Sequence, residues 1–222
     1  MDDNQGILIE KNGCENLLIS FGGIKQNIGM PVFEFYKSLQ GIECDKCFVR
    51  DFNQAWYHLG VDENCNSIDS VKNHLEKIIE AGNYKKICFV GNSMGGYAAI
   101  LFGVLLDVNK ILVFSPQTFI GKWRRFLYKD KRWSVQINRI HKSKKVNKRY
   151  FDLLNIFKEN KSFGGTISVY FSKNDKLDAL HAKRMKNNKL VNLNEINLGG
   201  HNLVRELKSL GKLDVILAEL FN

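Results

Sequence analysis

The stretch of residues 86–102 constrains the fold of this chain more than any other. Residues 86–90 form a short apolar run that predicts a buried strand, and residues 97–102 are small and apolar, which predicts a buried helix. Between them stands Gly91-Asn92-Ser93-Met94-Gly95. A strand that turns sharply into a helix needs glycines beside the turning residue, because they allow close backbone approach and a strained conformation. Such a turn would bring the Ser93 hydroxyl to the edge of a sheet, within reach of a base.

Length and composition predict one globular domain over residues 1–222. The chain has 222 residues, enough for a sizeable core, and 44% of them are hydrophobic, which is ordinary for a globular protein. No apolar run approaches the roughly 20 residues that span a bilayer. The acidic start Met1-Asp2-Asp3-Asn4 does not look like a secretory signal, so we expect a cytoplasmic protein.

The cysteines predict neither disulfides nor a metal site. There are five, an odd number in a chain without a signal, so we interpret them as free thiols. Cys44 and Cys47 form one CxxC, but no second pair and no His pair follows at ligand spacing. The pair leads into a strand-like run instead of opening a helix, which disfavours a redox role.

Strand-like and helix-like runs alternate along most of the chain. The expected strands are residues 6–10, 16–20, 44–50, 86–90, 110–114, 166–171 and 194–198. The expected helices include 32–39 after Pro31, 68–82 with Gly82 as its stop, and 203–221 with Gly211 inside it. This alternation predicts an α/β fold with a mostly parallel central sheet and helices on both faces.

One basic segment interrupts the alternation. Residues 121–161 contain no convincing strand, and we expect a helical insertion over about 117–163. Lys and Arg far outnumber acids there, and aromatic residues such as Trp123, Phe126 and Trp133 are interleaved with them. In a sheet of this kind an insertion at this place lies over the carboxyl ends of the strands, as a lid over a ligand site. A solvated helical face is the simplest interpretation, and binding of an anionic substrate or surface is the alternative.

Partners for Ser93 occur later in the chain. A serine nucleophile needs a base to take its proton and an anion to orient that base. His201 follows the strand-like run 194–198, and Asp175 and Asp178 follow the run that ends near Ser172. The order Ser, Asp, His is expected when the partners come from later strand ends. Asp175 is our first choice for the acid by its distance from the strand, and Asp178 is the second.

These features together resemble the α/β-hydrolase superfamily, in particular its small serine esterases. The resemblance rests on Gly91-Asn92-Ser93-Met94-Gly95, the aspartates after a later strand, and Gly-Gly-His201 before the last helix. It implies an oxyanion hole formed by the backbone N–H of Met94 and that of Gly23, with Gly22 as the second choice. Phe21 stands where such proteins usually have the His of a His-Gly pair. The resemblance also implies that neither a cofactor nor a metal takes part.

Three residues after the strand 44–50 lie where substrate could bind. Asp51, Trp56 and Tyr57 follow a strand end on the expected rim of the site. Substrate binding and packing of the loop are equally compatible with their positions.

Three functions remain open from the sequence. The first is a serine hydrolase that cleaves a carboxylic ester or thioester through an acyl-enzyme. The second is an acyltransferase on the same triad, and the third is a non-catalytic module that holds an anionic polymer through the basic insertion. The expected substrate is an acyl ester of a small molecule or a glycan, and the net charge of +10 leaves an anionic one open. Nucleic acid is not favoured, because no recognised nucleic-acid motif accompanies the charge.

Overall fold

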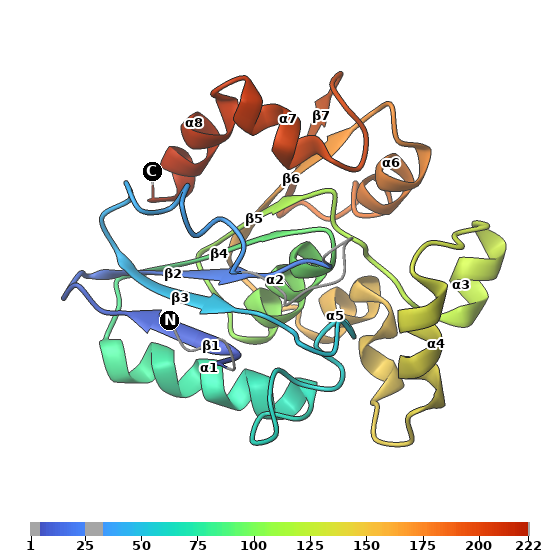
Figure 1. The fold of residues 1–222 in the computed structure, drawn as a ribbon, viewed down its shortest axis with the longest axis horizontal. Coiled ribbons are helices and arrows are strands. Elements are labelled where there is room, and N and C mark those ends of the chain that lie inside the picture. The colour runs from blue at the N-terminus through green and yellow to red at the C-terminus, as the bar shows by residue number, and fades with distance from the viewer. Residues whose placement is uncertain (1–4, 25–32, 222) are drawn as a thin grey trace.

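A central sheet with helices on both faces forms the body of the protein (Figure 1). The computed structural model describes residues 5–24 and 33–221, and within these ranges seven strands form one sheet in the order β1-β3-β2-β4-β5-β6-β7. The strands are β1 (Ile7–Glu10), β2 (Asn16–Phe21), β3 (Asp45–Val49), β4 (Lys86–Asn92), β5 (Lys110–Phe114), β6 (Thr166–Ser172) and β7 (Val191–Ile196). Only the edge strand β1 pairs antiparallel, with β3. The predicted strands and the mostly parallel pairing are confirmed, with β7 beginning three residues earlier than expected.

Two hydrophobic cores lie on opposite faces of this sheet. Successive side chains of a strand point to opposite faces, so Leu17 and Ile19 of β2 enter one core while Leu18 enters the other. The first core includes residues of α1 (Ile68–Gly82), α2 (Met94–Leu105) and α5 (Leu153–Glu159), and the second includes residues of α7 (Leu203–Ser209) and α8 (Lys212–Ala218). Nearly every side chain of α2 is buried, which explains its uniformly apolar sequence.

The predicted helix 68–82 is confirmed as α1. Ser67 caps it with its hydroxyl on the N–H of Ser70, and the Ser70 hydroxyl accepts in return from the N–H of Ser67. Gly82 is its last helical residue, and Asn83 beyond it takes the left-handed conformation, with φ of 46°.

Two other predicted helices differ in the structure. Within the predicted helix 32–39, residues 34–39 form turns, because Phe35 has a left-handed φ of 61° that no α-helix accommodates; Pro31 and Val32 lie outside the described residues. The predicted single helix 203–221 is divided into α7, α8 and a 3₁₀ turn, η2 (Glu219–Phe221). Gly211 causes the main break, since its φ of 66° is left-handed.

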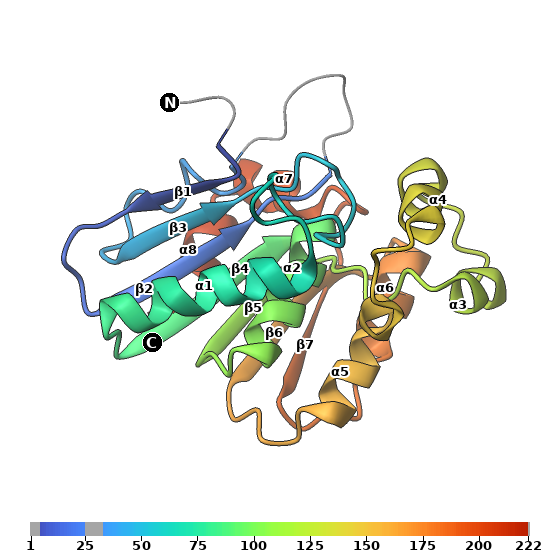
Figure 2. The same cartoon turned by 90° about the horizontal axis from the view of Figure 1, so that it is seen from below.

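The connection between β5 and β6 consists of two parts. It contains α3 (Lys122–Leu127), α4 (Ser134–Lys142), the 3₁₀ turn η1 (Lys148–Phe151) and then α5. Figures 1 and 2 show α3 and α4 projecting beyond the sheet, whereas α5 packs with α2 beside it. The helical, strand-free character predicted for 121–161 is confirmed. Since α5 belongs to the layer that covers the sheet, only α3 and α4 stand out from the body.

The helices of the described ranges are too short or too polar to cross a membrane. The apolar side chains of the sheet and its covering helices are used in the two cores instead. The carboxyl ends of the parallel strands remain as the place where loops from several strands converge.

Candidate active site

Ser93 lies at the sharp turn between β4 and α2. Its φ and ψ are 53° and −114°, a strained conformation for any residue with a side chain. A Cβ atom at Gly91 would collide with the carbonyl oxygen of Gly95, and one at Gly95 would collide with that of Phe21. Both glycines are therefore required by the close approach of backbone to backbone, as the sequence pattern indicated.

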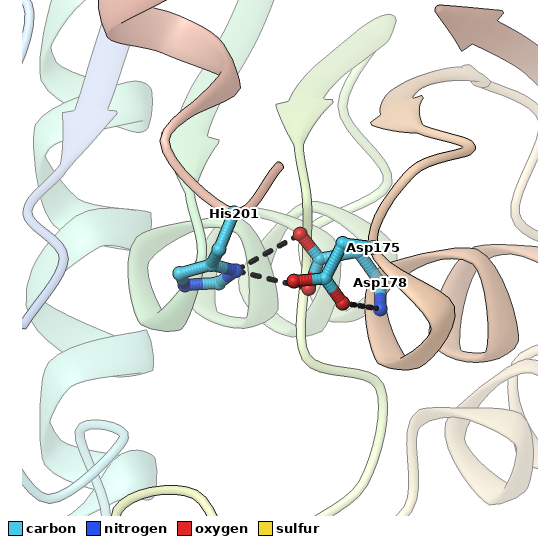
Figure 3. Close-up of side chains that lie close together, drawn as sticks. All are labelled: Asp175, Asp178 and His201. Atoms are coloured by element: carbon cyan, nitrogen blue, oxygen red, sulfur yellow. Dashed lines mark hydrogen bonds and ion pairs between the residues drawn. The ribbon is translucent and has the colours of Figure 1, made fainter. Parts of the chain in front are cut away.

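His201 connects Ser93 to a buried carboxylate. Nε2 of His201 lies 3.0 Å from Oγ of Ser93. On the other side of the ring, Nδ1 lies 2.9 Å from both carboxylate oxygens of Asp178 (Figure 3). Because a carboxylate only accepts, Nδ1 carries the proton and Nε2 is left to accept from the Ser93 hydroxyl. This is the arrangement in which a serine can lose its proton as it attacks a carbonyl carbon.

The carboxylate beside His201 is that of Asp178, whereas the sequence placed Asp175 first. Asp175 is the N-cap of α6 (Lys176–Lys183), where its Oδ1 accepts from the backbone N–H of Leu177 and of Asp178 at 3.0 and 2.9 Å (Figure 3). A capping carboxylate turns back onto its own helix, and His201 hydrogen-bonds Asp178 instead. Asp178, three residues later, points to His201 from the first turn of that helix.

The same three residues are also the group whose spacing would suit a metal ion among the described residues. Ligand atoms of Asp175, Asp178 and His201 lie within 4.8 Å of one another. Each already has a hydrogen-bond partner within the protein. Asp178 and His201 hydrogen-bond each other, and Asp175 accepts from backbone N–H groups of α6.

Arg132 also hydrogen-bonds the buried carboxylate of Asp178. Its Nη1 donates to Oδ1 of Asp178 over 2.7 Å. Burial raises the pKa of Asp178, but the hydrogen bonds and charges of His201 and Arg132 outweigh burial and bring the pKa below its ordinary value of 3.8. Asp178 is therefore ionised at neutral pH. No sequence pattern distinguishes Arg132 from the many other basic residues of its segment.

A second buried histidine extends this network. Arg132 also donates to Asp130, and Nε2 of His181 lies 3.1 Å from Oδ2 of Asp130. The backbone N–H of Thr118 donates to Nδ1 of His181, so the proton is on Nε2. Burial raises the pKa of Asp130, but His181 and Arg132 outweigh it and hold the pKa well below its ordinary value. Polar groups thus connect His181 through Asp130 and Arg132 of the projecting segment to Asp178, and both ends of this connection lie on α6.

The expected oxyanion donors differ in availability. The amide of Met94 begins α2 and makes no hydrogen bond to the parts of the chain that the structure describes. The Gly23 N–H donates to Oε2 of Glu34 over 2.7 Å. The Gly22 N–H donates to the carbonyl oxygen of Val49 over 2.8 Å and so continues the sheet, which leaves this second-choice donor unavailable.

Glu34 is a site residue that the sequence did not indicate. Oε1 of Glu34 accepts from Nδ2 of Asn92 at 3.0 Å, next to Ser93, while its other oxygen accepts from Gly23. Burial raises the pKa of Glu34 above its ordinary value of 4.5, although both hydrogen bonds and the neighbouring His201 act in the opposite direction. Glu34 falls within a stretch predicted as a helix, and only the turn at Phe35 brings it to the site.

A pocket of about 430 Å³ opens onto Ser93 and His201. It is lined by Gly23, Ile24, Glu34, Asn92, Ser93, Trp133, His201, Asn202, Val204, Arg205 and Lys208. Trp133 comes from the segment between α3 and α4, and Arg205 and Lys208 come from α7. Neither of these two cations forms an ion pair with any residue in the described ranges.

The three expected rim residues do not reach this pocket. Asp51, Trp56 and Tyr57 are all buried, and none of them lines it. The Asp51 carboxylate accepts from the backbone N–H of Tyr57, and burial raises the pKa of Asp51 to about 6. The Tyr57 hydroxyl lies within hydrogen-bond distance of the carbonyl oxygens of Gly22 and Val49. The structure thus favours packing of the loop beneath Gly22 over substrate binding.

Comparisons with known proteins rest on structure alone. No family model matches the chain, and no curated protein matches it in sequence. The capsule O-acetyltransferase of Neisseria meningitidis serogroup A superposes with a TM-score of 0.72 at 17% identity, over 98% of this chain and 92% of that one. A mutant of that enzyme, solved in complex with CoA, gives 0.70 at 16% identity, over 98% of this chain and 92% of that chain.

Two proteins of Staphylococcus aureus are also similar in structure. The fluorophosphonate-binding serine hydrolase FphF has a TM-score of 0.64 at 12% identity, over 96% of this chain and 92% of that one. MenH has a TM-score of 0.61 at 13% identity, with 97% of each chain covered. At such identities the likeness concerns the fold, and it agrees with the mostly parallel sheet and the sharp turn at Ser93. The chain therefore has the α/β-hydrolase fold.

Proposed function

We propose that this chain is a serine hydrolase that cleaves a carboxylic ester or thioester through an acyl-enzyme on Ser93. The observation that carries the proposal is the continuous path from Ser93 through His201 to Asp178, with distances of 3.0 and 2.9 Å. The Ser93 end of this path lies at a strained turn and lines a pocket of about 430 Å³. A nucleophile, a base and an orienting anion at these distances are the parts that acyl transfer needs.

In the first half of the proposed reaction, Oγ of Ser93 attacks the acyl carbonyl carbon as its proton moves to Nε2 of His201. The ionised Asp178 stabilises the resulting imidazolium and does not itself take the proton. The tetrahedral intermediate collapses when His201 gives that proton to the leaving alcohol or thiol. In the second half, water attacks the Ser93 ester with His201 as base, which releases the acid and restores the Ser93 hydroxyl.

The developing oxyanion is stabilised in this scheme by the backbone N–H groups of Met94 and Gly23. A fixed donor of this kind lowers the barrier by about 3 kcal/mol. The Gly23 N–H is held by the Glu34 carboxylate in this structure, so Glu34 has to release it before Gly23 takes part. Met94 is the donor that is already free of partners in the described part of the chain.

The substrate we propose is an acyl ester of a small molecule or a glycan. A pocket of about 430 Å³ is of the size that takes a small molecule or part of a larger one. Arg205 and Lys208 on its wall support a negatively charged group in the substrate, because among the described residues neither cation has a carboxylate partner.

An acyltransferase is the second candidate, and the structural comparison favours it. The capsule O-acetyltransferase that shares the fold has been solved with CoA, a thioester carrier. In this variant of the mechanism the acyl-enzyme forms in the same way, and the hydroxyl or amine of an acceptor replaces water. Acyl release that accelerates with an added sugar or amine acceptor, with the acyl group recovered on that acceptor, would distinguish a transferase from a hydrolase.

Labelling with a fluorophosphonate probe tests the proposal directly. We expect the folded wild type to become labelled and Ser93→Ala to remain unlabelled, since the probe reacts with an activated serine. Ser209→Ala, an exposed serine on α7, is the matched control and should label as the wild type does. A folded wild type that neither labels nor cleaves short acyl esters would contradict both the hydrolase and the transferase.

A further inference from the structure

The α3 helix exposes large apolar side chains to solvent. Trp123, Phe126 and Leu127, here called the α3 patch, have exposed fractions of 73%, 78% and 53%. The rings of Trp123 and Phe126 lie side by side with centroids 6.2 Å apart, and no residue of α3 is buried. A helix on a protein surface normally turns such side chains toward the core. In the described part of the chain, nothing covers them.

The position of α3 separates this patch from the rest of the protein. Both views show α3 standing away from the sheet and its covering helices, at the end of the projecting segment (Figures 1 and 2). Val135, in the first turn of the adjoining α4, is also 82% exposed. Exposed apolar side chains that cluster on a projecting segment are typical of sites that bind a membrane or another protein.

The exposed charged residues on α3 and beside it in the chain, within residues 121–149, are all basic. Asp130 is the single acidic residue between Gly121 and Arg149, and it is buried. Lys122, Lys129 and Lys131 are exposed near the patch, and none of them forms an ion pair with a residue of the described ranges. The occupant of this surface must therefore accept apolar side chains and carry negative charge.

We propose that the α3 patch docks on the surface of an anionic phospholipid bilayer. Trp123, Phe126 and Leu127 would enter the boundary between headgroups and acyl chains, where aromatic and aliphatic side chains are stabilised. The ammonium groups of the three lysines would lie at the level of the lipid phosphates. A soluble polyanion would use the lysines but leave Leu127 and Phe126 in water, and a neutral protein partner would not use the lysines.

Docking at this place would bring a segment that also lines the pocket to the membrane surface. The segment that carries the α3 patch continues directly into Arg132, which bonds Asp178, and Trp133, which lines the pocket. The surface is distinct from the groups that react, so the proposal does not depend on the chemistry at Ser93. Ser93→Ala should therefore bind vesicles as the wild type does.

Vesicle flotation tests the proposal with the full chain. We expect binding to vesicles of phosphatidylcholine with about 30% phosphatidylserine, weak binding to phosphatidylcholine alone, and a loss of affinity as salt is raised. The triple variant Trp123→Ser, Phe126→Ser, Leu127→Ser should bind at least tenfold less. The triple variant Lys122→Glu, Lys129→Glu, Lys131→Glu should also bind these vesicles at least tenfold less. On binding, the emission of Trp123 should shift to shorter wavelength, and Trp123→Phe should remove that shift.

The control replaces two other exposed apolar residues away from α3. Leu210 and Val215, near α7 and α8, are 53% and 64% exposed, so Leu210→Ser with Val215→Ser should bind vesicles as the wild type does. No binding to the anionic vesicles overturns the proposal. A second outcome also overturns it: the lysine variant weakens binding to vesicles or heparin, but the apolar variant binds as the wild type does. That result would indicate a soluble polyanion as the partner. Dimerisation that the apolar variant abolishes, without vesicle binding, overturns it in favour of a second copy of this chain.

Discussion

Arg132 donates a hydrogen bond from Nη1 to Oδ1 of Asp178 over 2.7 Å, across 46 residues of sequence. The same carboxylate accepts a hydrogen bond from Nδ1 of His201, and Nε2 of His201 contacts Ser93. One buried aspartate therefore connects the projecting basic segment to the candidate nucleophile. The simplest sequence interpretation of that segment was a solvated helical face. For Arg132 this interpretation is wrong, because its guanidinium contacts two buried carboxylates.

The first prediction concerns Arg132 as a positioning residue. Arg132→Met leaves Asp130 and Asp178 buried with one partner fewer, which should lower the free energy of unfolding by about 3 kcal/mol at neutral pH. Displacement of Asp178 should lower kcat by about 10². Because Arg132 helps to lower the pKa of Asp178 in the folded protein, the wild type loses stability as pH falls below the pKa of this group in the unfolded chain. The variant should lose less over the same range, so the difference in stability between the two should shrink toward pH 3. Urea unfolding from pH 3 to pH 8 measures this.

Two further variants separate position from charge at Arg132. Arg132→Lys keeps the charge and should recover part of kcat, whereas Arg139→Met on the exposed face of α4 should change neither kcat nor stability. A kcat of Arg132→Met equal to that of the wild type would show that Asp178 is held in place without it.

The second prediction separates the two aspartates. Asp178→Asn should lower kcat by about 10⁴, since an amide beside His201 favours the wrong tautomer. Asp175→Asn should keep both kcat and stability, because asparagine caps a helix as well as aspartate does. Asp175→Ala should keep kcat. Its free energy of unfolding should fall by about 1 kcal/mol, because the helix cap is missing. Equal, small effects of Asp175→Asn and Asp178→Asn on kcat would reject both as the acid.

Local sequence signals predicted the elements that bring the serine and the histidine to the site. The strand, the glycines and the apolar helix around Ser93 act within a few residues of one another, so their pattern could be interpreted directly. The choice between Asp175 and Asp178 also had a local signal that was missed. An aspartate one residue before a helix is a capping residue, and its carboxylate is then occupied by backbone N–H groups.

Long-range partners could not be predicted in this way. Glu34 meets Gly23 and Asn92 only because Phe35 adopts a left-handed turn, and no pattern in residues 33–39 distinguishes that turn from a helix. Arg132 is one cation among many in its segment, and only the folded connection between β5 and β6 selects it for Asp178. Composition therefore indicated a basic segment but not which of its residues reaches the site.

The third prediction uses the charge of Glu34. Its pKa in the folded protein lies above the ordinary 4.5, so ionisation is less favourable in the folded than in the unfolded chain, and Glu34 makes the wild type less stable as pH rises through this range. Glu34→Gln should thus be more stable than the wild type at pH 7, and this difference should vanish near pH 4. The amide can still accept from Gly23, and it can donate to Oδ1 of Asn92 once the Asn92 amide turns by 180°, since Nδ2 is the atom that faces Glu34 in the wild type.

The activity of Glu34→Gln follows from the same contact. A hydrogen bond to a neutral carbonyl is about half as strong as one to a carboxylate, so Gly23 should be released more easily for an oxyanion. We expect kcat for a neutral ester to rise a few-fold at pH 7, with Ser38→Ala as a control in the same turn region. A tenfold fall in kcat with unchanged stability would instead indicate that the Glu34 carboxylate contacts the substrate.

The fourth prediction concerns Arg205 and Lys208 on the wall of the pocket. If they receive a negative group of the substrate, Arg205→Ala with Lys208→Ala should raise KM about fivefold for an acyl ester that carries a carboxylate or phosphate. The KM for a neutral ester of the same acyl group should not change, and neither should kcat, since within the described residues neither side chain hydrogen-bonds Ser93 or His201. The effect should shrink at high salt because exposed charges are screened.

Lys212→Ala, at the start of α8 and outside this pocket, is the control. Equal changes in KM for the charged and the neutral ester would mean that these residues shape the pocket and do not recognise charge.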